Sequence, residues 1–278
     1  MSGLARHDSS TGAAAMIADQ FVRARLEARA LKAYPGIVPS DIEAAYRCQE
    51  AAIERWPERV GGWKVARIPP AQQGQYGEER LIGPAFRNNI RTARPGEVLE
   101  CPVFEGGFAA VEAELIIRVG INAPAQKTEW TLDEAAAIVG ELCIGIEVAS
   151  SPLATLNDLG AGAVISDFGN NWGIVVGGAI AGWRTLHEAI ALSFIDDEFV
   201  GRGASSLRHG PLSALAFTLA KCAKRGRPLR AGDVITTGMI TGVHDIRIGQ
   251  RSRHVFEGFG EVSCRAVRAV AHAGARRP

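Results

Sequence analysis

Two glutamates separated by one residue, Glu112 and Glu114, lie in the apolar segment 108–117 and have the spacing of metal ligands. In a β-strand alternate side chains share one face, so both carboxylates point the same way, ~7 Å apart along the chain. Two carboxylates on an apolar strand repel each other and lose hydration, and the arrangement becomes favourable when one cation binds both. The pair therefore indicates a metal site.

A third carboxylate, Glu147, is the only charged residue in the segment 142–148. Oxygen ligands without His or Cys select a hard ion such as Mg²⁺, Mn²⁺ or Ca²⁺, and Mg²⁺ keeps positions open for water or a chelating substrate. The alternative is structural: Glu112 and Glu114 line a solvated sheet face, and Glu147 pairs with an arginine. The lone charge at Glu147 favours the metal.

Lys64 stands between apolar neighbours in a strand predicted at residues 63–68. A buried lysine needs a partner, and desolvation makes it an acid/base group or a carboxylate partner; the alternative is an edge lysine with its ammonium in solvent. Gln49 interrupts the apolar face of a predicted helix, where it is either a packing amide or a ligand contact.

Two polar turns between apolar strands complete the candidates. Residues 166–173 contain Asp167, and residues 236–242 contain Thr237 and Gly238. Asp, Asn and Gly are natural turn residues, so a structural role is the default for the first turn, with a site loop as the alternative. The second turn offers hydroxyls and backbone amides suited to an anionic group. The sequence has no nucleophile motif, no His pair at metal spacing and no GxGxxG pattern.

Composition bounds the class of protein. A chain that is 47% hydrophobic and 22% charged is ordinary globular protein, and a net charge of +1 gives no reason to expect nucleic acid or an anionic membrane. No apolar run approaches the ~20 residues that span a bilayer, and the first residues lack the apolar core of a secretory signal. The five cysteines are scattered and odd in number, which favours reduced thiols and a cytoplasmic protein.

The elements that must position these residues follow from periodicity and end signals. Helices are predicted at residues 13–33, after a capping box of Ser40 and Glu43, at 131–140 behind a box of Thr131 and Glu134, and at 211–224, with a short turn at Thr185. Strands are predicted at 63–68, 107–119, 142–148, 172–176, 192–200, 233–237 and 262–270. Helices followed by mostly strands, without regular alternation, predict an α+β fold with a mixed or antiparallel sheet. We expect a single folding unit in which an N-terminal helical extension (1–60) precedes a mixed-β catalytic part (61–278).

Taken together, these residues resemble the fumarylacetoacetate hydrolase superfamily, in its 2-keto-4-pentenoate hydratase and 4-oxalocrotonate decarboxylase branch. The resemblance runs from the N-terminal helices almost to the end of the chain. Its carriers are Ala45-Tyr46-x-x-Gln49, Gly62-x-Lys64-Val65, Val111-Glu112-Ala113-Glu114, Ile146-Glu147, Asp167, and Pro228-Leu229-Arg230-Ala231-Gly232-Asp233 followed by Thr237-Gly238. No single motif is decisive, but their order and spacing are specific.

The resemblance implies a mixed β-sheet rolled into a barrel-like core, as in the C-terminal domain of fumarylacetoacetate hydrolase. It implies Mg²⁺ or Mn²⁺ held by Glu112, Glu114 and Glu147, and a small 2-oxo acid that chelates the ion. Lys64 and Asp167 match catalytic positions; Gln49, Thr237 and Gly238 match substrate-contacting or supporting ones. The family habit also implies a homo-oligomer.

Two departures from the family pattern bear on the reaction. The segment after Glu147, Val148-Ala149-Ser150-Ser151-Pro152, lacks the family's acidic residue and arginine. Arg87 stands where hydratases tend to have an acidic residue, so it is either a contact for a second substrate carboxylate or a surface arginine.

The expected reaction is hydration of 2-hydroxypenta-2,4-dienoate to a 4-hydroxy-2-oxo acid, as in aromatic catabolism. The alternatives are decarboxylation of a 2-oxo-3-enedioate, C–C hydrolysis of an acylpyruvate, and an inactive partner subunit of a pathway complex.

Overall fold

Five of the seven apolar strands predicted from the sequence lie in the larger of two sheets. The computed structural model describes residues 3–272; the ends of the two predicted segments, at residues 1–2 and 273–278, lie outside this range. The described strands are β1 (Val60–Arg67), β2 (Arg80–Phe86), β3 (Ile90–Thr92), β4 (Val98–Val103), β5 (Phe108–Val119), β6 (Val139–Ser151), β7 (Asn171–Ala179), β8 (Glu188–Ile195), β9 (Glu198–Ser206), β10 (Val234–Thr236), β11 (His244–Asp245), β12 (Arg251–Phe256) and β13 (Gly260–Arg268).

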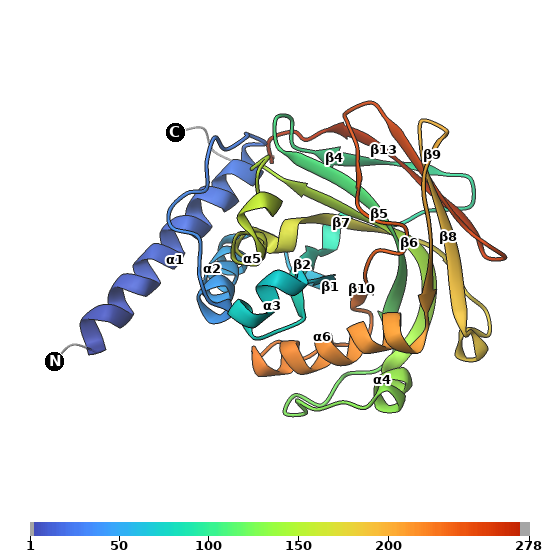
Figure 1. Cartoon of the computed structure of the whole chain (residues 1–278), viewed down its shortest axis with the longest axis horizontal. Coiled ribbons are helices and arrows are strands. Elements are labelled where there is room, and N and C mark those ends of the chain that lie inside the picture. The colour runs from blue at the N-terminus through green and yellow to red at the C-terminus, as the bar shows by residue number, and fades with distance from the viewer. Residues whose placement is uncertain (1–2, 273–278) are drawn as a thin grey trace.

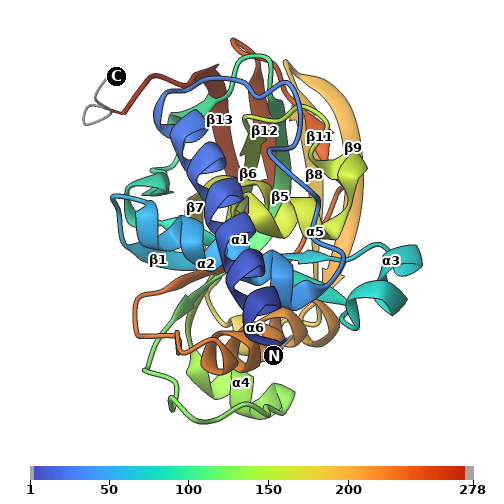
Figure 2. The ribbon, with the colours of Figure 1, turned by 90° about the vertical axis from the view of Figure 1, so that its left-hand side faces the viewer.

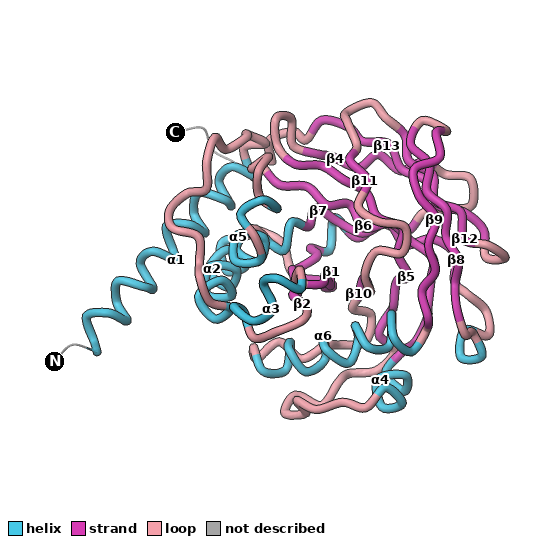
Figure 3. The backbone as a smooth tube through the Cα atoms, viewed as in Figure 1, coloured by secondary structure: helices cyan, strands magenta, loops and turns pink. Residues whose placement is uncertain are grey.

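The larger sheet has the strand order β2-β1-β10-β5-β6-β7-β3, with β11 also paired to β5, and the smaller sheet has the order β4-β13-β12-β8-β9. Both are mixed, because β1 and β10, β3 and β7, and β4 and β13 pair in parallel while the other neighbours are antiparallel. The strands curl into a partial barrel on one side of the molecule, and most helices gather on the other (Figures 1 and 3). The predicted α+β fold with a barrel-like mixed sheet is therefore confirmed.

The helices cover the open side of this barrel. The described helices are α1 (Gly3–Leu26), α2 (Ile42–Arg55), α3 (Pro70–Tyr76), α4 (Leu132–Ile138), α5 (Ala161–Ser166) and α6 (Ser213–Lys224), the last preceded by a π-type turn at Arg208–Leu212. Figure 2 shows α1 lying across α2, and α6 running beneath both. No helix within residues 3–272 is long and apolar enough to cross a membrane.

Three predicted helix or turn boundaries differ from those in the structure. The helix predicted at 13–33 ends at Leu26, and Ala28 follows with a positive φ of 51°. The cap of α2 is Asp41 rather than Ser40, because the Asp41 carboxylate accepts the Ala44 N–H at 2.7 Å. A short turn is present at the predicted place, but Thr185 ends this 3₁₀ turn, Trp183–Thr185, rather than beginning it. The box at Thr131 and Glu134 is confirmed by both of its hydrogen bonds.

The strand predicted at 192–200 is wrong, because this segment contains a tight turn. Asp196 and Asp197 have φ values of 49° and 67°, and the chain reverses there between β8 and β9. Two successive residues with positive φ make the turn that matches the right-handed twist of a hairpin, and aspartate tolerates that conformation better than most residues. The smaller sheet therefore contains an edge strand, β9, that the sequence pattern did not separate from β8.

Candidate metal and active site

Neighbouring strands bring the three glutamates together at the centre of the larger sheet. In the antiparallel pairing of β5 with β6, Glu112 lies directly opposite Glu147, and Glu114 lies opposite Gly145. One carboxylate oxygen from each glutamate falls within 4.8 Å of the others. Glu114 and Glu147 are fully buried, and Glu112 is 8% exposed. The solvated sheet face considered from the sequence is therefore excluded.

Backbone amides and a hydroxyl hold two of the carboxylates in place. Glu114 Oε2 accepts the N–H groups of Thr237 and Gly238, both at 2.7 Å. Thr236 Oγ1 donates to Glu147 Oε2 at 2.9 Å. The predicted anion-binding amides of this turn thus bind an anionic group, but that group is a glutamate of the chain itself.

Lys64 is the cation of the cluster. It is 4% exposed, and its Nζ lies 2.9 Å from Glu147 Oε1. Gly169 makes room for it, because a Cβ there would lie 3.2 Å from the Lys64 side chain. Gly83, opposite Lys64 in β2, instead lets the backbone of Phe168 approach, because a Cβ there would lie 2.1 Å from Phe168 O. Lys64 is therefore a buried, paired lysine and not an edge lysine.

The charges of the cluster alter each other's protonation. Burial raises the pKa of Glu112 to about 8, and Glu147 adds to this rise while Lys64 opposes it. Burial likewise holds the pKa of Glu114 well above its usual range, with Glu147 and Glu112 adding to the effect. Burial lowers the pKa of Lys64, but the carboxylates of Glu147, Glu112 and Glu114 together raise it above its ordinary value. The lysine is therefore an ammonium at neutral pH.

The residues of this cluster fit a hard divalent cation. Glu114 Oε1 is buried and accepts no hydrogen bond within the described part of the chain. Three carboxylates and one ammonium carry a formal charge of −2, which a divalent ion neutralises in a dry setting. A donor set made only of carboxylate oxygens is the set that Mg²⁺ and Mn²⁺ prefer.

A cavity of about 570 Å³ opens beside the cluster. Lys64, Glu112, Thr237 and Gly238 line it, as do Phe108, Val65, Leu81 and Met239. Of the three glutamates, only Glu112 lines the cavity. A mostly apolar pocket with a few convergent polar groups is the usual form of a small-molecule site.

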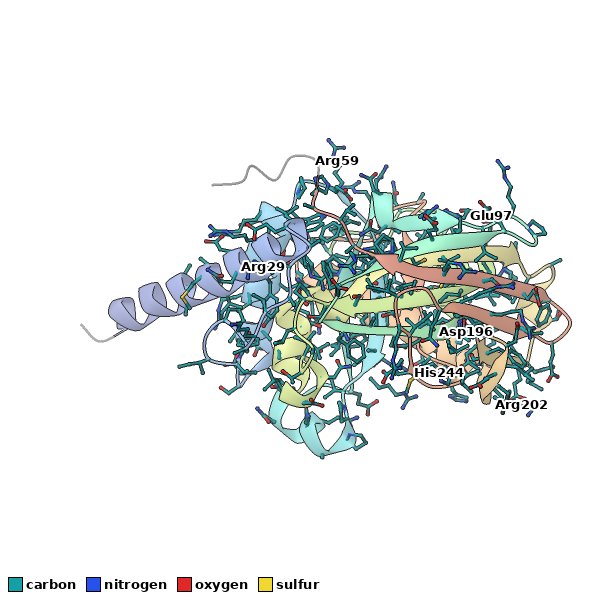
Figure 4. All side chains as sticks on the ribbon, turned by 90° about the horizontal axis from the view of Figure 1, so that it is seen from above. Arg29, Arg59, Glu97, Asp196, Arg202 and His244 are labelled. Carbon is teal, nitrogen blue, oxygen red and sulfur yellow. The ribbon has the colours of Figure 1, made fainter. Side chains whose placement is uncertain are left out.

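The loop after β10 is tied to the smaller sheet through hydroxyl and imidazole groups. Thr241 Oγ1 bonds Ser193 Oγ at 2.6 Å and His244 Nε2 at 3.0 Å, and Ser193 Oγ bonds His254 Nδ1 at 2.7 Å. His244 lies on the side of the molecule away from α1, with Asp196 and Arg202 near it (Figure 4). The loop that carries the Glu114-binding amides is therefore anchored at both ends.

Asp167 does not lie on the cavity. It is fully buried, and its carboxylate forms an ion pair with Arg25 of α1, with Nε at 2.5 Å and Nη2 at 2.9 Å. Arg25 also donates to the carbonyls of Asn171 and Ser150. Both of its carboxylate oxygens bond Arg25, so its position does not support the catalytic role predicted for Asp167, which stays a prediction.

Gln49 and Arg87 also lie away from the cavity. Gln49 is fully buried, and its Nε2 donates to the carbonyls of Ile82 and Ile165. Of the two alternatives drawn from the sequence, this position fits a packing amide. Arg87 is exposed in the turn Arg87–Asn89 after β2 and is the surface arginine of the two alternatives. Neither position supports the predicted contact with substrate.

Sequence reasoning missed several residues that do line or support the site. Arg80 and Arg67 line the cavity from β2 and β1, and His209 does so from the turn before α6. Thr236, which orients Glu147, also accepts the Val65 N–H at 3.2 Å. The segment that carries Arg80 was not predicted as a strand, so its pairing with β1 had no signal in the sequence.

No family model matches the sequence. Among solved structures, 4-oxalocrotonate decarboxylase from Pseudomonas putida G7, complexed with calcium and acetate, has 21% sequence identity and a TM-score of 0.73, covering 92% of this chain and 98% of that chain. The same enzyme complexed with magnesium and adipate has 21% identity and a TM-score of 0.73, with 91% and 97% covered.

Fumarylpyruvate hydrolase from Pseudomonas aeruginosa, in complex with Mn²⁺ and pyruvate, has 21% identity and a TM-score of 0.56, covering 77% of this chain and 91% of that chain. These likenesses establish the fold. The chain has the fold of these enzymes, and the fold expected from the resemblance of its sequence motifs is confirmed.

Proposed function

We propose that this chain is a divalent-metal-dependent lyase acting on a small 2-oxo acid. One observation carries the proposal: three buried carboxylates converge within 4.8 Å beside a buried lysine, at the wall of a cavity large enough for a small organic acid. A structural subunit gains nothing from such a cluster, because burying unpaired carboxylates destabilises the fold.

Glu112, Glu114 and Glu147 would hold Mg²⁺ or Mn²⁺, which supplies a Lewis acid that stabilises negative charge developing on a bound 2-oxo acid. The amides of Thr237 and Gly238 and the hydroxyl of Thr236 keep two ligands in position. Lys64 holds a proton at Nζ at the cavity wall, where it serves as a proton donor or anchors an anionic substrate. The apolar lining limits the access of bulk water.

The solved structures with this fold support the choice of ligand. The Pseudomonas putida decarboxylase is complexed with magnesium and adipate in one structure and with calcium and acetate in another. The fumarylpyruvate hydrolase is complexed with Mn²⁺ and pyruvate. Carboxylic acids and divalent ions are thus the ligands that these enzymes bind.

Hydration of a 2-hydroxy-2,4-dienoate such as 2-hydroxypenta-2,4-dienoate is the first candidate reaction. Decarboxylation of a 2-oxo-3-enedioate is the second, and the cationic side chains of Arg80 and Arg67 at the cavity favour a dicarboxylic substrate. Product analysis separates the two, because only the second releases carbon dioxide. The predicted homo-oligomer and cytoplasmic location stay predictions.

The proposal is tested with the metal-free protein. After dialysis against EDTA, turnover of the dienoate should be lost, and Mg²⁺ or Mn²⁺ should restore it. Glu147→Gln should lower the metal-dependent rate at least about 100-fold, since a ligand matters no less than the groups that orient one.

Glu141→Gln is the matched control, because Glu141 lies in the same strand, is exposed and pairs with Arg118 away from the cavity. Its activity should equal that of the wild type. Full activity in EDTA would contradict the metal assignment. A thermal shift with Mg²⁺ and oxalate addresses the inactive partner subunit: no metal-dependent stabilisation by oxalate would favour that alternative.

A further inference from the structure

One buried amide oxygen on the cavity wall has no hydrogen-bond partner. Asn170 is 3% exposed and lines the cavity, and its Nδ2 donates to Asn157 Oδ1 at 3.2 Å. Within residues 11–272, whose side chains the structure describes, Asn170 Oδ1 accepts no hydrogen bond, and no other buried unpaired oxygen or nitrogen belongs to a residue that lines the cavity. Because an unpaired buried acceptor is costly, this oxygen indicates a ligand that donates to it.

The next residue along the chain offers a comparison. Asn171 is also 3% exposed, its Nδ2 donates to the Pro84 carbonyl at 3.0 Å, and its Oδ1 is likewise unpaired in the described part of the chain. Asn171 does not line the cavity, whereas Asn170 does. The two asparagines are therefore matched in burial and chemistry, and only Asn170 can meet a ligand in the cavity.

An unusual backbone conformation holds Asn170 in place. Phe168, Gly169 and Asn170 have φ values of 53°, 68° and 62°, a region that asparagine adopts more readily than a bulky residue such as phenylalanine. The Phe168 ring is fixed by contacts with the rings of Phe86, at 5.0 Å, and Trp56, at 5.6 Å. Strain of this kind persists where the surrounding structure enforces it, and it is concentrated at functional sites.

The same turn brings Asn170 next to the buried lysine. A Cβ on Gly169 would lie 3.2 Å from Lys64 Cε, and Lys64 in turn pairs with Glu147. Lys64, Glu112 and Asn170 all line the one cavity. The unpaired amide oxygen therefore belongs to the part of the wall beside the carboxylate cluster.

An amide oxygen accepts hydrogen bonds and does not take up a proton at neutral pH, so its ligand must offer an O–H or N–H group. The ionised carboxylate and the 2-oxo group of a small 2-oxo acid are acceptors only. In hydration the oxygen of water bonds to C4, the C3–C4 double bond takes a proton at C3, and the water releases one proton, so that one water is added in all. The product carries a hydroxyl donor at C4, two bonds from the 2-oxo carbon.

We propose that Asn170 Oδ1 accepts a hydrogen bond from the C4 hydroxyl of a 4-hydroxy-2-oxo acid, and from the water that becomes this hydroxyl. This role rests on the proposed function, because it assumes that the 2-oxo end binds at the carboxylate cluster. Decarboxylation of a 2-oxo-3-enedioate neither forms nor uses a hydroxyl at C4. Asn170 therefore determines specificity in favour of hydration.

Binding of two acids that differ only in this hydroxyl tests the role of Asn170. Isothermal titration in the presence of Mg²⁺ would compare each enantiomer of 4-hydroxy-2-oxopentanoate with 2-oxopentanoate. The wild type should bind at least one enantiomer about 10-fold more tightly, the effect of one hydrogen bond to a group that is otherwise unpaired. Asn170→Gly, which suits the positive φ, should remove this preference and leave the affinity for 2-oxopentanoate unchanged.

Two further variants separate the contact from the stability of the turn. Asn171→Ala, which loses the bond to the Pro84 carbonyl, should lower the melting temperature and keep the full preference. Asn170→Asp keeps an acceptor oxygen, so it should keep the preference while its negative charge weakens binding of both acids.

The outcomes distinguish the role of Asn170 from the proposed function. Equal Mg²⁺-dependent binding of the hydroxylated and unhydroxylated acids by the wild type, or a preference that survives in Asn170→Gly, would overturn the role of Asn170 alone. Absence of Mg²⁺-dependent binding for all of these acids would overturn the proposed function together with it.

Discussion

Glu112 is the member of the carboxylate cluster that faces both the cavity and its neighbours. It lies on the same face of β5 as Glu114, opposite Glu147 of β6, and within the field of Lys64 on β1. Three carboxylates beside one ammonium favour binding of a positive charge, and without a metal that charge is a proton. We therefore expect metal binding at this residue to release a proton.

The stability of the metal-free protein should fall as pH rises from 6.5 to 8. The pKa of Glu112 is raised to about 8 in the folded protein, so the folded state binds more protons than the unfolded state above pH 4.5. Its stabilising contribution is full below 4.5 and is lost as pH rises through 8. Each proton changes the free energy of unfolding by up to about 1.4 kcal/mol per pH unit. Urea denaturation in EDTA measures this slope.

Glu112→Gln should reduce that slope, and the raised pKa of Glu114 should keep part of it. Saturating Mg²⁺ should reduce it as well, because the ion replaces the proton. His254 does not interfere in this window: burial lowers its pKa to about 3, and its unfolded pKa lies near 6.5, so its contribution falls only below that value. Equal slopes in the wild type and the variant would contradict the coupling.

The residues of the site differ in how far sequence could predict them. The sequence predicted four residues of the cluster because a charged residue is unusual in an otherwise apolar strand. These are Glu112, Glu114, Glu147 and Lys64. The position of Asp167 away from the cavity was not predicted, because its partner, Arg25, lies 142 residues away in the chain, and spacing carries no information on that contact. Arg87 was predicted as a substrate contact for a similar reason, because spacing does not show that it lies away from the cavity that Arg80 lines.

At the scale of elements, the loop after β10 holds the side chain of Glu114 in place through its backbone N–H groups. Gly238 has a φ of 106° and donates its N–H to Glu114 Oε2 at 2.7 Å. Gly242, four residues on, has a φ of 108°, and within residues 3–272 its N–H forms no hydrogen bond with a carboxylate. The two glycines share a conformation that side chains rarely adopt, and only one of them bonds a metal-ligand candidate.

Gly238→Ala should weaken Mg²⁺ binding about 10- to 100-fold, the cost of losing a group that orients a ligand. A Cβ at Gly238 meets nothing within 4 Å, so the effect comes from the backbone, whose strain is about 1–3 kcal/mol. Titration calorimetry measures the affinity, and thermal denaturation the strain.

Gly242→Ala is the matched control. It should lower the melting temperature by a similar amount, since the nearest atom to its Cβ, in His244, lies at an ordinary 3.7 Å. Its affinity for Mg²⁺ should equal that of the wild type. Equal losses of affinity in the two variants would show that loop strain, and not the amide of Gly238, determines metal binding.

The sequence predicted strands correctly where their apolar runs are long. The predictions failed where the turn between two strands is short. β5, β6 and β7 were found because they are central strands with few polar residues. β8 and β9 were merged because their turn is only Asp196 and Asp197. β2 was missed because it contains Pro84, which is tolerated only because β2 lies at the edge of its sheet.

The whole molecule is held together by an ion pair that joins its two predicted parts. Arg25 of α1 binds Asp167, the residue that follows α5, and its guanidinium also lies 5.2 Å from the ring centre of Phe168. The side chains of both Arg25 and Asp167 are buried. We therefore expect residues 1–60 and 61–278 to unfold together, although the division between them stays a prediction.

Asp167→Asn should lower the free energy of unfolding by about 3–5 kcal/mol, because it leaves the buried charge of Arg25 uncompensated. Chemical denaturation should be followed by far-ultraviolet circular dichroism, which reports the helices, and by tryptophan fluorescence, which mostly reports the barrel. The two curves should coincide in the wild type and shift together in the variant.

Asp19→Asn is the matched control for this change. Asp19 of α1 pairs with Arg55 of α2, but the Asp19 side chain is 53% exposed, so its loss should cost less than about 1 kcal/mol. Asp167→Asn should also leave Mg²⁺ affinity near the wild-type value, since its side chain does not face the cavity. Separate transitions for helices and barrel would contradict the single folding unit. A selective loss of turnover in a fully folded Asp167→Asn protein would restore the catalytic role that the sequence motif suggested.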